Sequence, residues 1–333
     1  MPSDATGRVL VTGATGFAGG HLARALASRG ERVRVLVRDG ARAGDLAATP
    51  GIEVCVGDLK DPAARTRAVD RVVTVYNIAA IYRQAGVPAS EYRAVNTEAV
   101  AELVWAAARA GARRVVHCST VGVHGDVEHP PANEDAPLRP GDVYQETKLE
   151  GERAAREAAQ AAGIELVIAR PSGIYGPGDR RLLKLFRGVA RRRFLILGAG
   201  NIYYHLTYID DLVEGFCLCG TVPAAAGRTY ILAGGEVGTL TALVGLVAEE
   251  AGVTPPSLHL PVWPFWLAGA LCEAVCVPLR IEPPLYRRRV DFFTKNRAFD
   301  IGRAKAELGF APTVGLRQGI RQSLEWYRVK GWL

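Results

Sequence analysis

The fold of this chain is decided near its amino end, by the sequence RVLVTGATGFAGG at residues 8–20. Its first five residues form an apolar run that predicts a buried strand, and the apolar spacing at residues 22–26 predicts a helix after it. Between them, Gly13, Gly16 and Gly19 recur at every third position. This order is typical of dinucleotide binding, because the glycines let the backbone approach a pyrophosphate and the helix N-terminus favours its charge.

The second predicted strand, residues 32–38, bears on which nicotinamide cofactor binds. An acidic residue at the end of this strand would bind the ribose hydroxyls of NAD, whereas an arginine suits the 2′-phosphate of NADP. The sequence has Arg38 there, followed by Asp39 and, one turn further on, Arg42. The two arginines favour NADP, and Asp39 leaves NAD open as the alternative.

A tyrosine and a lysine four residues apart, Tyr144 and Lys148, carry the second chemical signal. On a helix this spacing places both side chains on one face. A phenol alone is a poor acid and base at neutral pH, because its ordinary pKa is about 10. A nearby ammonium favours the phenolate, so Lys148 is expected to lower the pKa of Tyr144 toward useful proton transfer.

Composition narrows the class of protein. The chain has 333 residues, of which 49% are apolar and 23% charged, as in a globular protein of one or two domains. The net charge is +7, but the basic clusters do not interleave with aromatics, so we expect a small-molecule partner and no nucleic acid. Six cysteines lie in apolar patterns without metal-ligand spacing, which predicts buried free thiols and no metal. The first strand starts too early to follow a signal peptide, so we expect a cytoplasmic protein.

Through residue 170, short apolar runs alternate with helical patterns. Strands are expected at residues 8–12, 32–38, 53–56, 72–77, 114–119 and 165–170. The alternation predicts an α/β fold, a doubly wound parallel sheet of the Rossmann type with ligands at the carboxyl ends of the strands. The later pattern predicts a smaller α+β C-terminal substrate domain. We expect a cofactor domain of residues 1–178 with a return segment at about 205–235, and a substrate-binding domain of 179–204 and 236–333.

Several further motifs follow in a fixed order. They are TGATGFAG at 12–19, GDL at 57–59, NIAA at 77–80, VNTE at 95–98, Ser119-Thr120 before Gly125, the Tyr144/Lys148 pair, RPSGIYGPG at 170–178 and YIDD at 208–211. Nearly end to end, the chain thus resembles an extended short-chain dehydrogenase/reductase of the NAD-dependent epimerase/dehydratase family.

The resemblance implies a role for each matching residue. Tyr144 would be the acid/base, Lys148 would hold the nicotinamide ribose, and Thr120 would polarise the reacting oxygen. Ser119 points to the opposite side of a strand, so we expect the backbone to satisfy its hydroxyl. The residues expected around the cofactor are Gly13, Thr15, Gly16, Phe17, Ala18, Gly19, Arg38, Asp58, Leu59, Ala79, Ala80, Tyr144, Lys148, Pro171 and Ser172.

Departures from the family pattern narrow the chemistry. Val121 and Gly122 stand where sugar-nucleotide dehydratases carry an Asp-Glu pair, so dehydration is not expected. Gly173 and Tyr204 stand where nucleotide-sugar epimerases tend to place an asparagine and a phosphate-binding arginine. The arginines at 287–289 could compensate. Asp210 and Asp211 precede a helical pattern, for which we expect an N-capping role.

Residues 262–279 are strongly apolar but short for a membrane span, and they contain two prolines. Three interpretations stay open: a helix lining a hydrophobic substrate pocket, a helix lying on a membrane surface with arginines at the headgroups, or a helix packed into the core of its own domain. This region resembles the corresponding stretch of the 3β-hydroxysteroid dehydrogenases, which act on lipid-like alcohols.

Together these features imply an NAD(P)-dependent oxidoreductase that interconverts a secondary alcohol and a ketone by hydride transfer, on a partly apolar substrate. A nucleotide-sugar 4-epimerase is the alternative. A non-catalytic NADP-binding sensor or scaffold is a third hypothesis, which the intact Tyr144/Lys148 pair disfavours. By resemblance we also expect a homodimer formed through the long helices, including the one that carries Tyr144.

Overall fold

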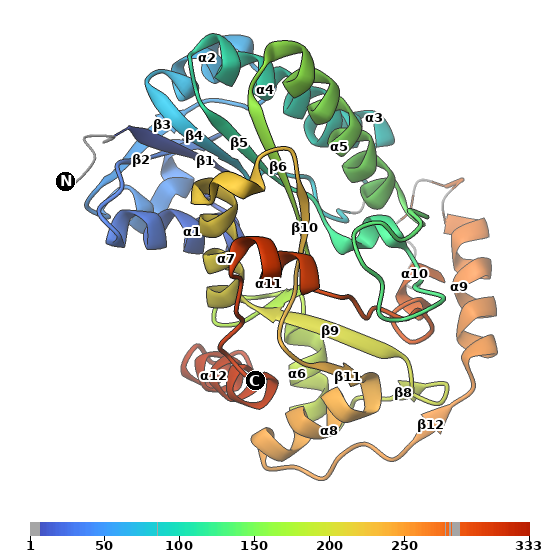
Figure 1. Cartoon of the computed structure of the whole chain (residues 1–333). Coiled ribbons are helices and arrows are strands. Elements are labelled where there is room, and N and C mark those ends of the chain that lie inside the picture. The colour runs from blue at the N-terminus through green and yellow to red at the C-terminus, as the bar shows by residue number, and fades with distance from the viewer. Residues whose placement is uncertain (1–6, 85, 277, 280, 282–286) are drawn as a thin grey trace.

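The computed structural model describes residues 7–84, 86–276, 278–279, 281 and 287–333. At its centre lies a seven-stranded sheet in the order β10-β6-β5-β4-β1-β2-β3, with all neighbours parallel (Figure 1). The strands are β1 (Arg8–Thr12), β2 (Val33–Val37), β3 (Ile52–Val56), β4 (Val72–Asn77), β5 (Arg114–Cys118), β6 (Glu165–Pro171) and β10 (Thr229–Leu232). Because β1 pairs with both β2 and β4, the strand order reverses at β1, which is where a Rossmann sheet binds its ligand.

Helices cover both faces of this sheet, as the doubly wound prediction requires. On one face α1 (Phe17–Ser28) packs against α7 (Ile209–Thr221). On the other, α4 (Ala99–Arg109) lies between α2 (Pro62–Val69) and α5 (Val143–Ala162). The shorter helical segments are η1 (Gly40–Leu46), α3 (Ala89–Arg93), the π-helical η2 (Ala94–Glu98), η3 (Val121–His124) and η4 (Pro223–Ala225).

The later part of the chain builds two small sheets. One has the order β11-β9-β7, and in the other β12 pairs with β8. Their strands are β7 (Gly173–Tyr175), β8 (Ile196–Leu197), β9 (Tyr203–Tyr208), β11 (Val237–Thr239) and β12 (His259–Leu260). The accompanying helices are α6 (Leu183–Ala190), α8 (Leu240–Ala251), α11 (Gly302–Leu308) and α12 (Leu316–Val329). The chain therefore leaves the large sheet after β6 and returns to it with β10; the domain bounds given above stay a prediction.

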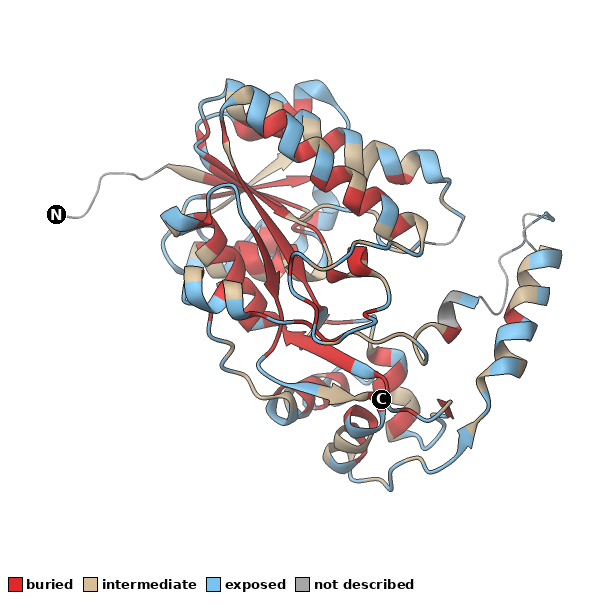
Figure 2. Cartoon of the chain, turned by 45° about the vertical axis from the view of Figure 1, so that its right-hand side comes forward, coloured by how far each residue is buried: buried red, intermediate tan, exposed pale blue. Residues whose placement is uncertain are grey.

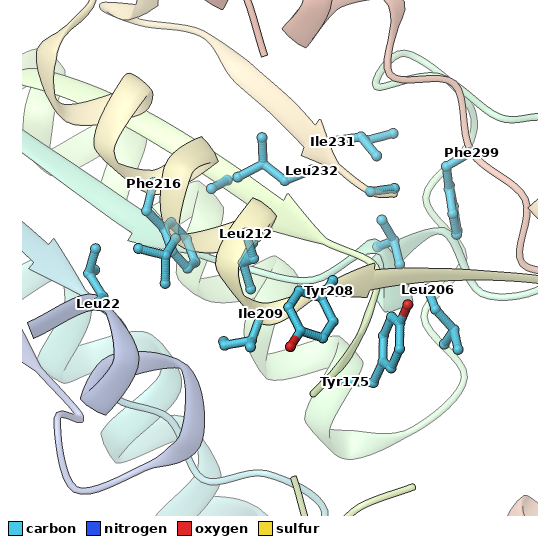
Figure 3. Close-up of a cluster of buried hydrophobic side chains, with 14 of the residues drawn as sticks. Leu22, Tyr175, Leu206, Tyr208, Ile209, Leu212, Phe216, Ile231, Leu232 and Phe299 are labelled. Atoms are coloured by element: carbon cyan, nitrogen blue, oxygen red, sulfur yellow. The ribbon is translucent and has the colours of Figure 1, made fainter. Parts of the chain in front are cut away.

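One hydrophobic core joins the two parts. It includes Leu22 of α1, Phe216 of α7 and Leu232 of β10, all of them buried (Figure 3). Where β7 meets β9, the rings of Tyr175 and Tyr208 pack edge to face, with 5.5 Å between their centroids. The cysteines are all free thiols, but only Cys217 and Cys219 are fully buried; the other four are half-buried, which corrects that part of the prediction.

Helix α9 (Val262–Cys276) stands away from the body of the molecule (Figures 1 and 2). Of its fifteen residues, all described, Gly269 alone is buried. Trp263 is 68% exposed and Leu271 is 66% exposed. The interpretation of this helix as part of its own domain's core was therefore wrong. Its main contact is with the short α10 (Arg287–Val290). Among the described residues, no helix combines the length and apolarity that crossing a membrane requires.

Candidate active site

A cavity of about 630 Å³ opens at the carboxyl ends of β1, β4, β5 and β6. Every residue that the sequence assigned to catalysis or to the cofactor lines this one cavity. These residues are Gly13, Thr15, Gly16, Phe17, Ala18, Gly19, Arg38, Asp58, Leu59, Ala79, Ala80, Thr120, Tyr144, Lys148, Pro171 and Ser172. They come from segments spread over 160 residues of sequence, and the parallel sheet brings them together because it aligns the strand ends at one edge.

The glycine turn after β1 fits a dinucleotide pyrophosphate. Gly13 has a φ of +69°, and a Cβ there would lie 2.7 Å from the backbone nitrogen of Ala79. A Cβ on Gly19 would lie 2.3 Å from the carbonyl oxygen of Gly13. Gly16 caps α1 without a side chain, so the first helix amides point out with no side-chain acceptor. Free amides at a helix N-terminus and a backbone without side chains are what a phosphate group needs.

A buried hydrogen bond between Thr12 and Asn77 holds the base of the glycine turn in place. The Thr12 hydroxyl donates to Asn77 Oδ1 at 2.6 Å and accepts from the backbone nitrogen of Ala79 at 3.1 Å. Thr12 ends β1 and Asn77 ends β4, so the bond ties together the two strands on either side of the topological switch. It also holds the segment at Ala79, against which Gly13 packs, in place.

At the end of β2, the two arginines of the sequence prediction separate. Arg38 lines the cavity, whereas Arg42 is exposed and lies outside the described cavity lining. The carboxylate of Asp39 accepts a hydrogen bond from the backbone nitrogen of Ala41 at 3.0 Å and thereby caps η1. Asp39 is thus engaged in capping and is not part of the described cavity lining, whereas the positively charged Arg38 is.

Tyr144 and Lys148 both lie buried on the first turns of α5. The Lys148 ammonium donates to the carbonyl oxygen of Cys118 at 2.6 Å and lies 3.4 Å from His117 Nε2. His117 also contacts the Asn77 amide at 3.2 Å, so it is a buried histidine with a structural role. Burial lowers the pKa of Lys148 and, together with the Lys148 charge, lowers that of His117.

The pKa of Tyr144 moves in the direction opposite to the one predicted. Burial raises it above the ordinary value of a tyrosine, and the neighbouring Tyr82 phenol, whose ring packs edge to face at 4.9 Å, acts in the same sense. The charges that lower the pKa are those of Arg83 and Arg181. Lys148 instead points to the end of β5, so the expected lowering by Lys148 is corrected by the structure.

Of the two hydroxyls after β5, that of Ser119 differs from expectation. Thr120 caps η3 and its Oγ1 accepts a hydrogen bond from the backbone nitrogen of Gly122 at 3.0 Å. Ser119 Oγ is buried and has no hydrogen-bond partner among the described residues. The prediction that the backbone satisfies Ser119 was therefore wrong. Both residues line the cavity, because the strand ends at Cys118 and the strict alternation of sides ends with it.

Sequence reasoning missed several polar residues of the cavity, among them Tyr82, Arg83, Arg181, Lys295 and Arg297. Tyr82 and Arg83 follow the Ala79-Ala80 motif after one intervening residue, and this closeness to a strand end was the available signal. Arg297 donates to the Tyr204 hydroxyl at 3.1 Å.

Of the three arginines proposed as compensation, the structure tests only Arg287. Arg287 is bound to Glu273 of α9 at 2.7 Å and does not line the described cavity, and the side chains of residues 288 and 289 lie outside the described part of the chain.

The prediction that Asp211 caps its helix was wrong. Asp211 accepts hydrogen bonds from the backbone nitrogens of Thr313 and Val314 at 2.8 and 3.2 Å, while Tyr208 occupies the cap position.

Known proteins are similar to this chain in sequence, and solved structures are similar to it in fold. Residues 9–233 match the NAD dependent epimerase/dehydratase family. A 3 beta-hydroxysteroid dehydrogenase/Delta 5-->4-isomerase of Mycobacterium tuberculosis is 31% identical over 96% of this chain and 90% of its own. Sterol demethylase protein B of Methylococcus capsulatus is 30% identical over 97% of this chain and 98% of its own.

Among solved structures, MoeE5 in complex with UDP-glucuronic acid and NAD superposes with a TM-score of 0.77. It is 27% identical and covers 97% of this chain and 100% of its own. The glycine turn, the reversed strand order and these matches agree with one another. The chain therefore belongs to the NAD-dependent epimerase/dehydratase family of extended short-chain dehydrogenases/reductases and is an NAD(P)-dependent enzyme.

Proposed function

We propose that this enzyme interconverts a secondary alcohol and a ketone, with Tyr144, Lys148 and Thr120 as its catalytic set. The observation that carries the proposal is that these three side chains line the same cavity as the glycine turn. When bound, the nicotinamide supplies the hydride chemistry. An intact acid/base at this place also disfavours the non-catalytic sensor or scaffold.

Each side chain has a defined task in this scheme. Thr120 Oγ1 already accepts the Gly122 N–H, so its single hydroxyl hydrogen is available to donate to the substrate oxygen. Tyr144 exchanges the hydroxyl proton of the substrate. Lys148 donates to the Cys118 carbonyl at the end of β5 and lines the cavity, and the contact that we assign to its ammonium in the complex is with the nicotinamide ribose.

For the cofactor we propose NADP. Arg38 lines the cavity where a 2′-phosphate would lie, and Asp39 caps η1 instead of competing for the ribose. Solved relatives such as MoeE5 carry NAD, so NAD is the alternative. We propose that the other residues named above as cofactor-binding, all of which line the cavity, make the remaining contacts with the cofactor.

A partly apolar alcohol or ketone, of the class handled by the sterol-directed relatives, is the proposed substrate. Leu182, Leu206, Phe292 and Phe299 give the substrate side of the cavity apolar walls. The runner-up is a nucleotide-sugar 4-epimerase. It is favoured by the cationic side chains on that side, among them Arg297, and by the UDP-sugar complex of MoeE5.

We also propose that residues 262–279 contact a membrane surface. The cavity lining described above draws on elements other than α9, which removes the pocket interpretation. Fifteen helical residues measure roughly 22 Å, short of the ~30 Å hydrocarbon layer, so the helix would lie along the surface. Trp263 and Trp266 suit the headgroup level. A cytoplasmic location and a homodimer through the long helices, including α5, remain predictions.

The decisive experiment on the chemistry changes Tyr144→Phe. Turnover should fall by at least 10²-fold while the affinity for NADP(H), measured by nucleotide fluorescence, stays the same. Tyr203→Phe, at an exposed position outside the cavity, is the matched control. Unchanged turnover in the Tyr144→Phe enzyme would remove the proposed reaction.

A second experiment separates the two substrate classes. The enzyme is incubated with 3β-hydroxysteroids and other apolar alcohols, and with UDP-sugars, and nicotinamide absorbance is followed. Because an epimerase regenerates its cofactor, the UDP-sugar arm also needs chromatographic product analysis. Absorbance change with the apolar alcohols supports the proposal, and conversion of a UDP-sugar alone replaces it with the runner-up.

A further inference from the structure

An arginine that no motif predicted lies against the ring of Tyr144. Arg83 places its guanidinium carbon 5.8 Å from the Tyr144 ring centroid and 5.7 Å from that of Tyr82. Its φ of +28° lies in the left-handed region, which is costly for a residue with a Cβ. The chain thus accepts local strain to present this side chain at the cavity wall.

The position of Arg83 is fixed from the helix that carries Tyr144. Arg83 Nε forms an ion pair with Asp142 Oδ2 at 3.0 Å. Asp142 in turn caps α5 by accepting the backbone N–H of Gln145 at 2.9 Å. The ion pair lacks hydrogen-bond geometry, and within the described part of the chain the buried Arg83 Nε has no hydrogen-bond partner.

Lys148 does not face the tyrosine ring in the same way. Its ammonium is engaged with the Cys118 carbonyl and with His117, on the side of β5. We propose that Arg83, in addition to Lys148, is a positioning residue that stabilises the phenolate of Tyr144. This inference rests on the acid/base role proposed for Tyr144.

The physical basis is the charge of the phenolate ring. A cation at a ring face is attracted by the π-electrons, and the attraction grows when the ring carries delocalised negative charge. Arg83 therefore gains more from the phenolate than from the phenol. Asp142 offsets part of this charge, but the ion pair also keeps the guanidinium over the ring.

The groups that face Tyr144 come from several elements. Tyr82 and Arg83 approach from the segment after β4, Cys118 from the end of β5, and Arg181 from the segment before α6. Lys148, one turn along α5, is engaged at the end of β5 instead. Burial, Tyr82 and Cys118 raise the pKa of Tyr144, whereas Arg83 and Arg181 lower it. Removing the Arg83 charge should therefore raise this pKa further.

The test is the pH profile of kcat/KM for alcohol oxidation, which needs the phenolate. In Arg83→Gln the rise of activity with pH should move to higher pH by about one unit or more, so that the rate below it falls about tenfold. Arg83→Lys, which keeps the charge, should restore most of the profile. Affinity for NADP(H) should stay within threefold of the wild type.

Arg93→Gln is the matched control. Arg93 of α3 pairs at 3.1 Å with Glu150 of α5, the helix that carries Tyr144, but this pair lies at an exposed site. Its replacement should therefore leave the pH profile of kcat/KM unchanged. An unshifted profile in both Arg83 variants, with Tyr144→Phe still inactive, would overturn this inference and leave the proposed reaction standing. A rise in KM alone, with the profile unshifted, would also overturn it, since Arg83 would then bind substrate. An active Tyr144→Phe enzyme would instead defeat the proposed reaction itself.

Discussion

Glu152 and Arg170 form a doubly hydrogen-bonded ion pair, buried between α5 and β6. Arg170 Nε donates to Glu152 Oε1 at 2.9 Å, and Arg170 Nη2 donates to Oε2 at 2.7 Å. The side chain of Arg170 is 4% exposed and that of Glu152 is 2% exposed, so both charges are removed from water. Arg170 immediately precedes Pro171 and Ser172 of the cavity wall. The pair therefore fixes the position of α5, which carries Tyr144, relative to β6, which ends at the active site.

Glu152→Ala should destabilise the protein by about 3–5 kcal/mol, because it leaves the Arg170 charge buried without its partner. Urea unfolding followed by circular dichroism measures the loss as a change in the free energy of unfolding. Glu157→Ala, at an exposed position of the same helix, should change it by less than about 0.5 kcal/mol. Equal effects of the two changes would mean that the buried pair contributes nothing specific.

Arg38→Ala should weaken NADP(H) binding about tenfold or more and leave NAD(H) binding nearly unchanged, since the 2′-phosphate would lose a charge-assisted hydrogen bond. Arg42→Ala is the control, because Arg42 lies four residues further on and outside the described cavity lining. Fluorescence titration with both reduced nucleotides measures each affinity. Equal losses for the two cofactors would assign Arg38 to a contact that they share.

Thr120→Ala should lower kcat by about 10²-fold, as expected for the loss of a donor to the reacting oxygen. Ser119→Ala should leave kcat within threefold, and it should keep or slightly raise stability because it removes a buried hydroxyl that has no partner among the described residues. Steady-state kinetics and thermal unfolding on both variants check these expectations. The reverse ranking of kcat would transfer the catalytic role to Ser119.

The double change Trp263→Glu and Leu271→Glu should abolish binding to vesicles of phosphatidylcholine with phosphatidylserine, because it places two charges on the exposed face of α9. Co-sedimentation with the vesicles measures the effect. Val329→Glu, on an exposed apolar position of α12, should retain binding. If the wild-type protein does not bind vesicles and the double change dissociates a dimer, then α9 forms an interface with a second copy of the chain.

The sequence predicted the bounds of β1 to β6 in the large sheet to within one residue at each end. Arg8–Thr12 and Val72–Asn77 are strands with the predicted bounds, because strands of a buried parallel sheet read as unbroken apolar runs. The site residues converge for a related reason, since motifs at strand ends are brought together by the topology.

Other features depended on contacts that no local pattern encodes. Asp211 looks like a helix cap, but its partners at Thr313 and Val314 lie about a hundred residues further along the chain. The pKa of Tyr144 is raised by burial and by Tyr82, which comes from a distant segment, so the spacing of Tyr144 and Lys148 predicted the wrong direction for this pKa. The apolar composition of α9 was equally compatible with a core, a pocket or a lipid contact.

Strand β10 closes the large sheet late in the order of synthesis. It pairs with β6 only after the chain has passed through β7, β8 and β9, so β6 is an unpaired edge until residue 232 has left the ribosome. An unpaired edge of a buried parallel sheet invites pairing with other chains. A fragment that stops at residue 178 should therefore aggregate during expression, whereas one that extends through residue 233 supplies its own closing strand.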